Sequence, residues 1–249
     1  MNLANIIRGL LNLERKIDVK YLPSQGLFYN DDFGISIKRA DSNDIKEYEE
    51  GYIKDDLGIV INKLKKIVEK NTKFSSEYNF NDVKSIDIIF LFLEIVRFTK
   101  GKALQLKYFN DETGNEEDIE FSSSYFNYFK PDIELSSNYD SELKEFNING
   151  YKFSLPSIGV ENCLTNYLMS KSNTENASAY NDYNYDFLFF LSGKRKITFD
   201  EIDNLIHIFN FDMDITEQKK VRKIIKMFQP LQKYSLKKVP LWTSRCEAM

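Results

Sequence analysis

The sequence is poor in the residues that build many catalytic sites and irregular folds. Its 249 residues include only 10 glycines and 5 prolines, below average usage, which argues against glycine-loop enzymes and β-propellers. Two cysteines and one histidine argue against a Cys/His metal site built from this chain. With His207 as its only imidazole, the chain is also a poor candidate for Ser-His-Asp or Cys-His catalysis.

Long apolar runs and targeting signals are also missing. Residues 1–13 lack the continuous apolar region and the small-residue cleavage site of a signal peptide. The longest apolar stretch, Ile86–Phe98, contains charged residues and is too short to span a bilayer. We therefore expect a soluble cytosolic chain in which Cys163 and Cys246 are free thiols rather than a disulfide.

The residues that are present predict a globular protein without catalytic machinery. Hydrophobic residues at 42% and charged residues at 29% exclude a collagen-like, mucin-like or fully disordered chain. No phosphate-binding loop, nucleophile elbow or zinc-binding helix motif occurs. Asp212, Asp214 and Thr216 are similar to the start of a calcium-binding loop, but Glu217 stands where that loop needs glycine. We expect a non-enzyme with no catalytic, cofactor-binding or metal-ligating residues.

Hydrophobic periodicity predicts an α+β fold with a mainly helical core and two small antiparallel β units. The chain reads as one compact unit, 1–249, with sub-regions 1–100, 101–156, 157–234 and 235–249. Apolar residues at helical spacing predict helices over 2–13, 42–52, 57–70, 86–98, 160–168, 185–191, 198–209 and 214–228. Thr198 with Glu201, and Asp214 with Glu217, form capping boxes that predict the starts of the last two of these helices. The helix over 86–98 is apolar nearly all round, so we expect Ile89, Phe90, Leu93 and Val96 to be almost fully buried.

Alternating residues predict the strands of the two β units. Strands are expected at Ile17–Tyr21, Leu27–Tyr29 and Ile35–Lys38 in the first unit, and at Leu104–Tyr108 and Ile119–Phe121 in the second. Asn149-Gly150 is the strongest hairpin signal in the chain. A two-residue turn there would pair Ile148 with Tyr151 and Phe146 with Phe153.

A five-residue pattern, Leu-Pro-Ser-x-Gly, occurs twice. It stands at Leu22–Gly26 and at Leu155–Gly159, each time after an alternating strand. Proline fixes φ and serine can cap the following turn, so we interpret the pattern as a repeated way of leaving a strand. An internal duplication is the alternative, although the segments that follow the two copies are unlike.

Charge is distributed unevenly along the chain. The stretch 218–246 holds nine basic residues and no acid, whereas Asp111–Glu145 holds eleven acids. A helix face would place the first of these cations in solvent, opposite Val221 and Ile224. The basic stretch can bind an acidic protein, anionic lipid or nucleic acid, or it can simply be a solvated face. The candidate partner contacts are Lys219, Arg222, Lys223, Lys226, Lys237, Lys238 and Trp242.

Three short motifs resemble one protein family. They are Tyr21–Tyr29 (YLPSQGLFY), Phe153–Gly159 (FSLPSIG) ahead of a helix, and the helix start Ile197–Ile202 (ITFDEI). Together with the order of elements from Val19 to Phe228, they resemble the T4-like phage baseplate hub assembly proteins. At 249 residues the chain is more similar to the longer, assembly-promoting member than to the shorter hub member.

The resemblance implies a function without covalent chemistry. It implies a late protein that promotes assembly of the phage tail baseplate hub in the host cytoplasm by binding other hub proteins in a chaperone-like manner. It supplies no catalytic residues and no cofactor, and it implies neither a membrane span nor nucleic acid as a partner. Two alternatives stay open: a structural subunit of the hub, and a nucleic-acid-binding protein that uses the basic C-terminus.

Overall fold

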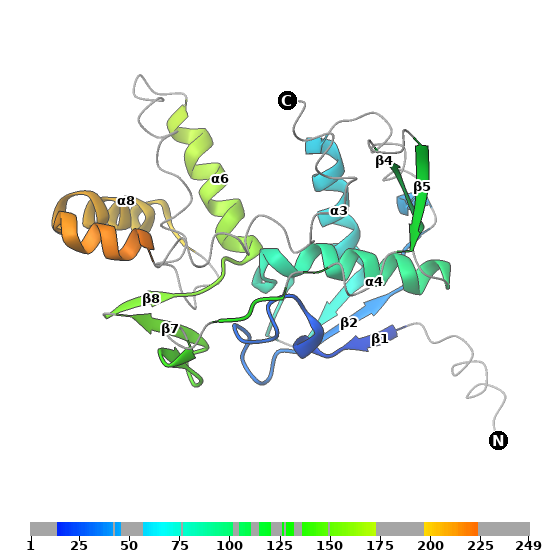
Figure 1. Ribbon diagram of the computed structural model, residues 1–249, viewed down its shortest axis with the longest axis horizontal. Coiled ribbons are helices and arrows are strands. Elements are labelled where there is room, and N and C mark those ends of the chain that lie inside the picture. Colours follow the sequence, from blue (N-terminus) through cyan, green and yellow to red (C-terminus); the bar gives the residue numbers. More distant parts are fainter. Residues whose placement is uncertain are drawn as a thin grey trace.

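The protein has an α+β fold, as predicted, in which helices pack beside small antiparallel sheets (Figure 1). The computed structural model describes residues 14–41, 43–45, 57–75, 77–101, 105–110, 115–120, 126, 128–131, 136–148, 150–172 and 197–223. Predictions for 2–13, 46–52, 185–191 and the chain beyond 223 lie outside the described residues. Figure 1 shows the N-terminal sheet with two helices toward one end, and α6, α8 and the β7–β8 hairpin toward the other.

The N-terminal sheet has the strand order β1-β2-β3. Its antiparallel strands are β1 (Glu14–Ile17), β2 (Ile35–Lys38) and β3 (Thr72–Phe74). Ile35 and Ile37 alternate with the partly exposed Ser36 and Lys38, so that one face of the sheet is buried and the other meets solvent. The strand predicted over Ile35–Lys38 is therefore confirmed.

Two helices cover the buried face of this sheet. They are α3 (Leu57–Asn71), which leads directly into β3, and α4 (Ile88–Lys100). Leu64, Ile67 and Val68 of α3 are buried in one core with the residues of α4 and the sheet. The amphipathic helix predicted over 57–70 is therefore confirmed.

Helix α4 begins later than its sequence predicts. Two short 3-10 turns, η2 (Phe80–Asp82) and η3 (Ser85–Asp87), precede it. Two of the four residues predicted to be buried, Ile89 and Leu93, are only half-buried. Because the helix is apolar nearly all round, its sequence did not define which stripe faces the core. The buried positions are Ile88, Phe90, Leu91, Phe92, Ile95 and Val96.

The predicted strands at Ile17–Tyr21 and Leu27–Tyr29 are wrong. Strand β1 stops at Ile17, because the Asp18 side chain accepts a hydrogen bond from the Lys20 N–H and starts the 3-10 turn η1 (Val19–Tyr21). The following residues, 22–29, form consecutive turns rather than an extended segment. The chain thus reverses direction before it enters β2.

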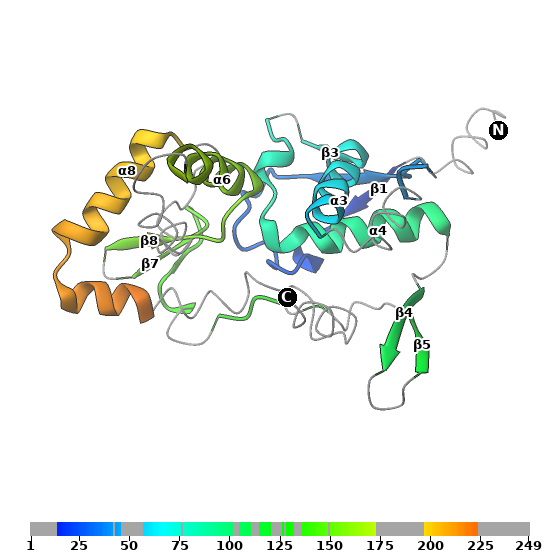
Figure 2. The same ribbon diagram turned by 90° about the horizontal axis from the view of Figure 1, so that it is seen from above.

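A separate hairpin follows α4. It pairs β4 (Gln105–Asn110) with β5 (Asn115–Glu120) and opposes Leu106 to Ile119. Two strands were predicted here, at Leu104–Tyr108 and Ile119–Phe121, but β5 begins four residues before the second of them. Figure 2 shows the hairpin projecting away from the body of the molecule beyond the C-terminal end of α4.

The third sheet carries the hairpin predicted at Asn149-Gly150. Its strands are β6 (Tyr139–Asp140), β7 (Glu145–Ile148) and β8 (Tyr151–Phe153). The register pairs Phe146 with Phe153 and Ile148 with Tyr151, which confirms the prediction. Strand β6, only two residues long, was not predicted. The buried side of this sheet packs Phe146 against Phe28 and Phe129.

The C-terminal part is helical. Helix α6 (Ile158–Ser172) packs Val160, Leu164 and Tyr167 against Ile197 and Ile202. Helix α8 (Phe199–His207) runs into a π-helical turn, η6 (Ile208–Asp212), and a further helix covers 215–223. The stripe predicted over 160–168 is confirmed, and the helix extends past it at both ends, from Ile158 to Ser172.

Candidate interaction surface

The two helix starts at the C-terminal end are fixed by the caps that the sequence predicts. At the start of α8 the Thr198 Oγ1 accepts a hydrogen bond from the Glu201 N–H at 3.3 Å, and Glu201 Oε2 accepts one from the Thr198 N–H at 2.9 Å. Asp214 Oδ1 accepts from the Glu217 N–H at 2.8 Å and caps the helix over 215–223. These caps hold the two helices on either side of η6.

Each of these helices has a buried side. Ile202 anchors α8 in the core with α6, and Val221 anchors the following helix against the β6–β8 sheet. Met213, in the turn between them, is also buried. The opposite sides of both helices are therefore turned outward.

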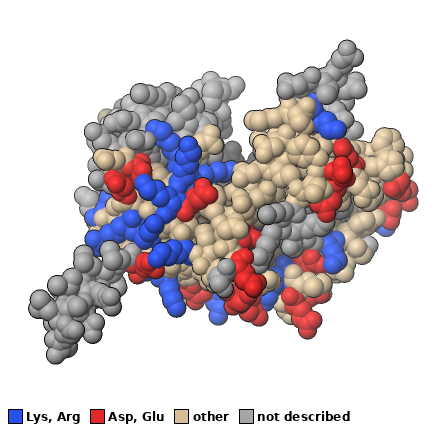
Figure 3. Space-filling view, turned by 180° about the vertical axis from the view of Figure 1, so that it is seen from behind, with Lys and Arg blue, Asp and Glu red and all other residues tan. Residues whose placement is uncertain are grey.

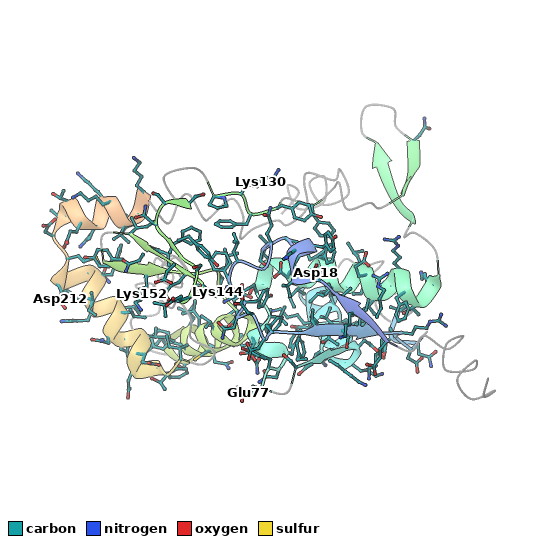
Figure 4. All side chains as sticks on the ribbon, turned by 90° about the horizontal axis from the view of Figure 1, so that it is seen from below. Asp18, Glu77, Lys130, Lys144, Lys152 and Asp212 are labelled. Carbon is teal, nitrogen blue, oxygen red and sulfur yellow. The ribbon has the colours of Figure 1, made fainter. Side chains whose placement is uncertain are left out.

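Large apolar side chains are exposed on that outward side. Phe211 is 73% exposed and Ile215 is 72% exposed, one on each side of the turn. Phe199 at the start of α8 and Met169 on α6 are exposed as well. Neighbouring exposed aromatic and aliphatic residues are typical of protein-binding surfaces. Figure 4 shows Asp212, which adjoins Phe211, at the end of the molecule farthest from the β4–β5 hairpin.

Cations adjoin this apolar group. Lys219, Arg222 and Lys223 are exposed, in agreement with the predicted helix face, and Val221 between them is buried. The Arg222 guanidinium carbon lies 5.1 Å from the centre of the Phe209 ring. The other candidate contacts, Lys226, Lys237, Lys238 and Trp242, lie outside the described residues. We name the surface formed by Phe211, Ile215, Lys219, Arg222 and Lys223 the helical surface.

His207 lies at the border of this surface. Its ring centre is 5.2 Å from that of Phe211, and its Nε2 is 3.7 Å from Asp212 Oδ1. The imidazole is largely exposed. Its neighbours are a phenyl ring and a carboxylate, which hold it at the rim of the turn.

A buried polar cluster links this end of the molecule to the N-terminal sheet. The Ser24 N–H donates to Asp87 Oδ1 at 2.8 Å, and the Tyr29 hydroxyl donates to Asp87 Oδ2 at 2.7 Å. The same hydroxyl accepts a hydrogen bond from the Lys84 N–H at 2.8 Å. We name these four residues, Ser24, Tyr29, Lys84 and Asp87, the polar joint.

The second Leu-Pro-Ser-x-Gly copy contacts the same segment from its other side. The Ser85 N–H donates to the Pro156 carbonyl at 3.1 Å, and the Ile158 N–H donates to the Val83 carbonyl at 2.9 Å. Lys84 and Ser157 form an isolated antiparallel bridge. Residues 83–87 therefore join the first copy to the second, and with it α6.

Burial perturbs the ionisable groups of the polar joint. Desolvation raises the pKa of Asp87 to about 6, although hydrogen bonds from Ser24 and Tyr29 oppose the shift. Desolvation lowers the pKa of Lys84 to about 8, against the attraction of Asp87 and Asp82. Desolvation and the Asp87 charge raise the pKa of Tyr29 well above its ordinary value. Asp87 is 0% exposed and Lys84 is 7% exposed, so the joint binds chain segments to each other rather than to a substrate.

Sequence reasoning missed the joint, although two signals pointed to it. Each copy of the repeated pattern contacts the polar joint through its serine, Ser24 at Asp87 and Ser157 at Lys84. Asp87 is also a charged residue within the longest apolar stretch of the sequence. The exposure of Phe211 and Ile215 was also missed, because the π-helical turn breaks the helical periodicity there.

Among the described residues, no group of three or more His, Cys, Asp or Glu side chains is placed to hold a metal ion. Within the same residues, no helix combines the length and the apolar character needed to cross a bilayer. Comparison of the chain with protein-family models, with curated proteins and with solved structures finds no match.

Proposed function

We propose that the protein is a non-enzymatic assembly factor that binds subunits of a phage tail baseplate hub through the helical surface. The observation that carries the binding role is the exposure of Phe211 and Ile215 beside the cations of the last described helix. Apolar residues of this size supply contact energy when a partner covers them. The protein would hold hub subunits in an assembly-competent arrangement without forming or breaking covalent bonds.

The two components of the helical surface have different roles in this proposal. Phe211 and Ile215 stabilise the bound state, because aromatic and aliphatic anchors near the centre of an interface contribute most of the affinity. Lys219, Arg222 and Lys223 accelerate and orient the encounter with an acidic partner. A change in the first group should therefore act on dissociation, and a change in the second on association and its salt dependence.

The identity of the partner rests on the resemblance to baseplate hub assembly proteins. Two of its motifs, at Tyr21–Tyr29 and Phe153–Gly159, supply the residues that contact segment 83–87. The third, at Ile197–Ile202, contains the cap of α8. Residues of all three motifs belong to the cores on which the two helices of the helical surface pack.

The test is binding and assembly with the hub proteins encoded alongside this chain. Phe211→Ser combined with Ile215→Ser should weaken binding by about tenfold or more and reduce the yield of complete hubs. Tyr21→Ser is the matched control, because Tyr21 is 68% exposed but lies in η1, near the N-terminal sheet. Unchanged binding by the double variant would contradict the proposal.

Mass spectrometry of purified virions distinguishes an assembly factor from a permanent subunit. An assembly factor is absent from the virion, whereas a structural subunit of the hub is present in stoichiometric amount. DNA binding by the intact protein at physiological salt, with a steep salt dependence, would favour the nucleic-acid alternative.

A further inference from the structure

The outer face of the N-terminal sheet is basic, a feature that lies apart from the helical surface. Strand alternation and the register place Glu14, Lys16, Ser36, Lys38 and Lys73 together on this face. Lys16 and Lys73 are exposed and stand on either side of Ser36. Glu14, the one acid of the set, pairs with Lys73. We name these five residues the sheet face.

The charge distribution on the rear face of the molecule agrees with this local pattern. In the view from behind, Lys and Arg side chains gather toward the end that carries β1 and β2, and Asp and Glu are more frequent toward the other (Figure 3). Helix α4 packs on the inner face of the sheet. Among the described residues, no element packs on the sheet face in the same way. An exposed cationic sheet face of this kind attracts an acidic ligand.

The β4–β5 hairpin has the opposite charge. Four of the six residues of β5 are acidic (Glu116, Glu117, Asp118 and Glu120), and β4 carries Lys107 as its only charge. The hairpin forms a two-stranded sheet of its own. Such an isolated hairpin is marginally stable in water, so a surface that it can pack against would stabilise it.

The hairpin and the sheet face lie on opposite sides of α4. Figure 2 shows β1 and β3 on one side of this helix and the hairpin projecting from the other, and Figure 4 shows the same arrangement from below. The hairpin of one molecule is therefore directed away from its own sheet face. It is free to approach the sheet face of another molecule.

We propose that the protein self-associates head to tail, with the acidic β4–β5 hairpin of one copy docked on the sheet face of the next. This inference goes beyond the proposed function and does not depend on the hub partner. The occupant is a second copy of this chain, because the chain itself carries both complementary surfaces. A contact between two different patches is heterologous, so it leaves one patch of each kind open and extends into chains or closes into a ring.

The first test needs no variant. Sedimentation velocity of the full-length protein over a range of concentrations should show mass growing at about 0.05 M salt and falling toward the monomer at about 0.5 M, because exposed charges are screened over a few ångströms at high salt. A protein that stays monomeric at low salt, or a mass that salt leaves unchanged, overturns the proposal.

Charge reversal then identifies the two surfaces. Glu116→Lys with Glu117→Lys and Asp118→Lys, or Lys16→Glu with Lys38→Glu and Lys73→Glu, should each weaken self-association by about tenfold or more. Mixing these two variants should restore self-association, because the unchanged hairpin of one variant matches the unchanged sheet face of the other, and the two reversed surfaces match each other as well. A variant that carries both sets of substitutions should again self-associate into longer assemblies, because its two reversed surfaces match.

A matched control separates this proposal from the function proposed above. Lys219→Glu with Arg222→Glu and Lys223→Glu changes the net charge by the same amount as reversal of the sheet face. It should leave self-association unchanged while slowing binding to hub proteins. Failure of the two mixed variants to associate with each other overturns the head-to-tail contact, and so does uptake of a nucleic acid by the sheet face of a monomeric protein.

Discussion

Leu22–Gly26 and Leu155–Gly159 share the pattern Leu-Pro-Ser-x-Gly but have different backbones. In the first copy Gln25 and Gly26 both have positive φ, 55° and 74°, and the chain turns back on itself. In the second copy Ser157 precedes α6, and Gly159 lies within the first turn of that helix. The same four residue types therefore open a reversal in one place and a helix in the other.

The two copies also reach segment 83–87 by different chemistry. The first is bound through a buried side chain, since the Ser24 N–H donates to the carboxylate of Asp87. The second is bound through backbone hydrogen bonds to Val83 and Ser85. Only the second copy follows a strand, β8, whereas η1 precedes the first. The tertiary partner of each copy, rather than the pattern itself, therefore decides which structure it adopts. This comparison argues against a duplicated structural unit, and changes on each side of the segment can test it.

Replacement of Asp87 should have the largest effect. Asp87→Ala removes the acceptor of the Ser24 N–H and of the Tyr29 hydroxyl, and it removes the negative charge that most stabilises the protonated form of the buried Lys84. We expect a loss of about 3–5 kcal/mol in the free energy of unfolding, measured by urea titration. Asp87→Asn should cost less, because its amide oxygen can still accept from Ser24. A loss below about 1 kcal/mol for Asp87→Ala would mean that the joint does not hold the first copy.

The pH dependence of stability should reveal the same carboxyl group. Its pKa is raised from 3.8 to about 6, so the folded state retains a proton that the unfolded state loses. The free energy of unfolding should therefore fall by about 2 kcal/mol as pH rises from 4 to 6, relative to Asp87→Asn measured in the same buffers. Using the variant as reference removes the contributions of the other carboxylates.

Lys84 should make the free energy of unfolding change with pH in the opposite direction, at alkaline pH. Its pKa is lowered from 10.5 to about 8, so the unfolded state binds the proton more tightly. Stability should rise between about pH 8 and pH 10 relative to Lys84→Met. Parallel pH profiles of the protein and its variants would contradict the assignment of buried charge to the joint.

The glycines of the two copies should respond differently to alanine. Gly26 has a φ of 74°, and a Cβ there would lie 3.0 Å from Val19 Cγ2, so Gly26→Ala should cost about 1–3 kcal/mol. Gly159 lies in α6 and is not among the described residues with positive φ, so Gly159→Ala should be neutral or gain up to about 1 kcal/mol. Equal shifts in melting temperature would contradict the difference in backbone.

What the sequence could predict depended on how local the determining contacts are. The register at Asn149-Gly150 follows from a two-residue turn, and the caps at Thr198 and Asp214 act within three residues, so these predictions are confirmed. The polar joint depends on Ser24 and Tyr29 meeting Asp87 across 63 and 58 residues, and no local pattern encodes that distance.

The residues of the helical surface also differ in whether the sequence predicted their exposure. The exposure of Lys219, Arg222 and Lys223 followed from the helical spacing of the apolar residues around Val221. The exposure of Phe211 did not, because the π-helical turn η6 rotates it out of the α8 stripe. In β1, the competing cap of Asp18 outweighed an alternation of apolar residues that predicted a longer strand.

The smallest expected effect concerns the serine that begins α6. Ser157 Oγ accepts a hydrogen bond from the Val160 N–H at 3.3 Å, and the serine is buried, so water cannot replace it as acceptor. Ser157→Ala should therefore lower the free energy of unfolding by about 1 kcal/mol, as for other helix caps. Ser157→Gly is the informative control, because glycine at a helix start costs only a few tenths of a kcal/mol. If the alanine and glycine variants unfold at the same urea concentration as the unmodified protein, Ser157 is not a cap, and the second copy would be held by its backbone bonds to Val83 and Ser85 alone.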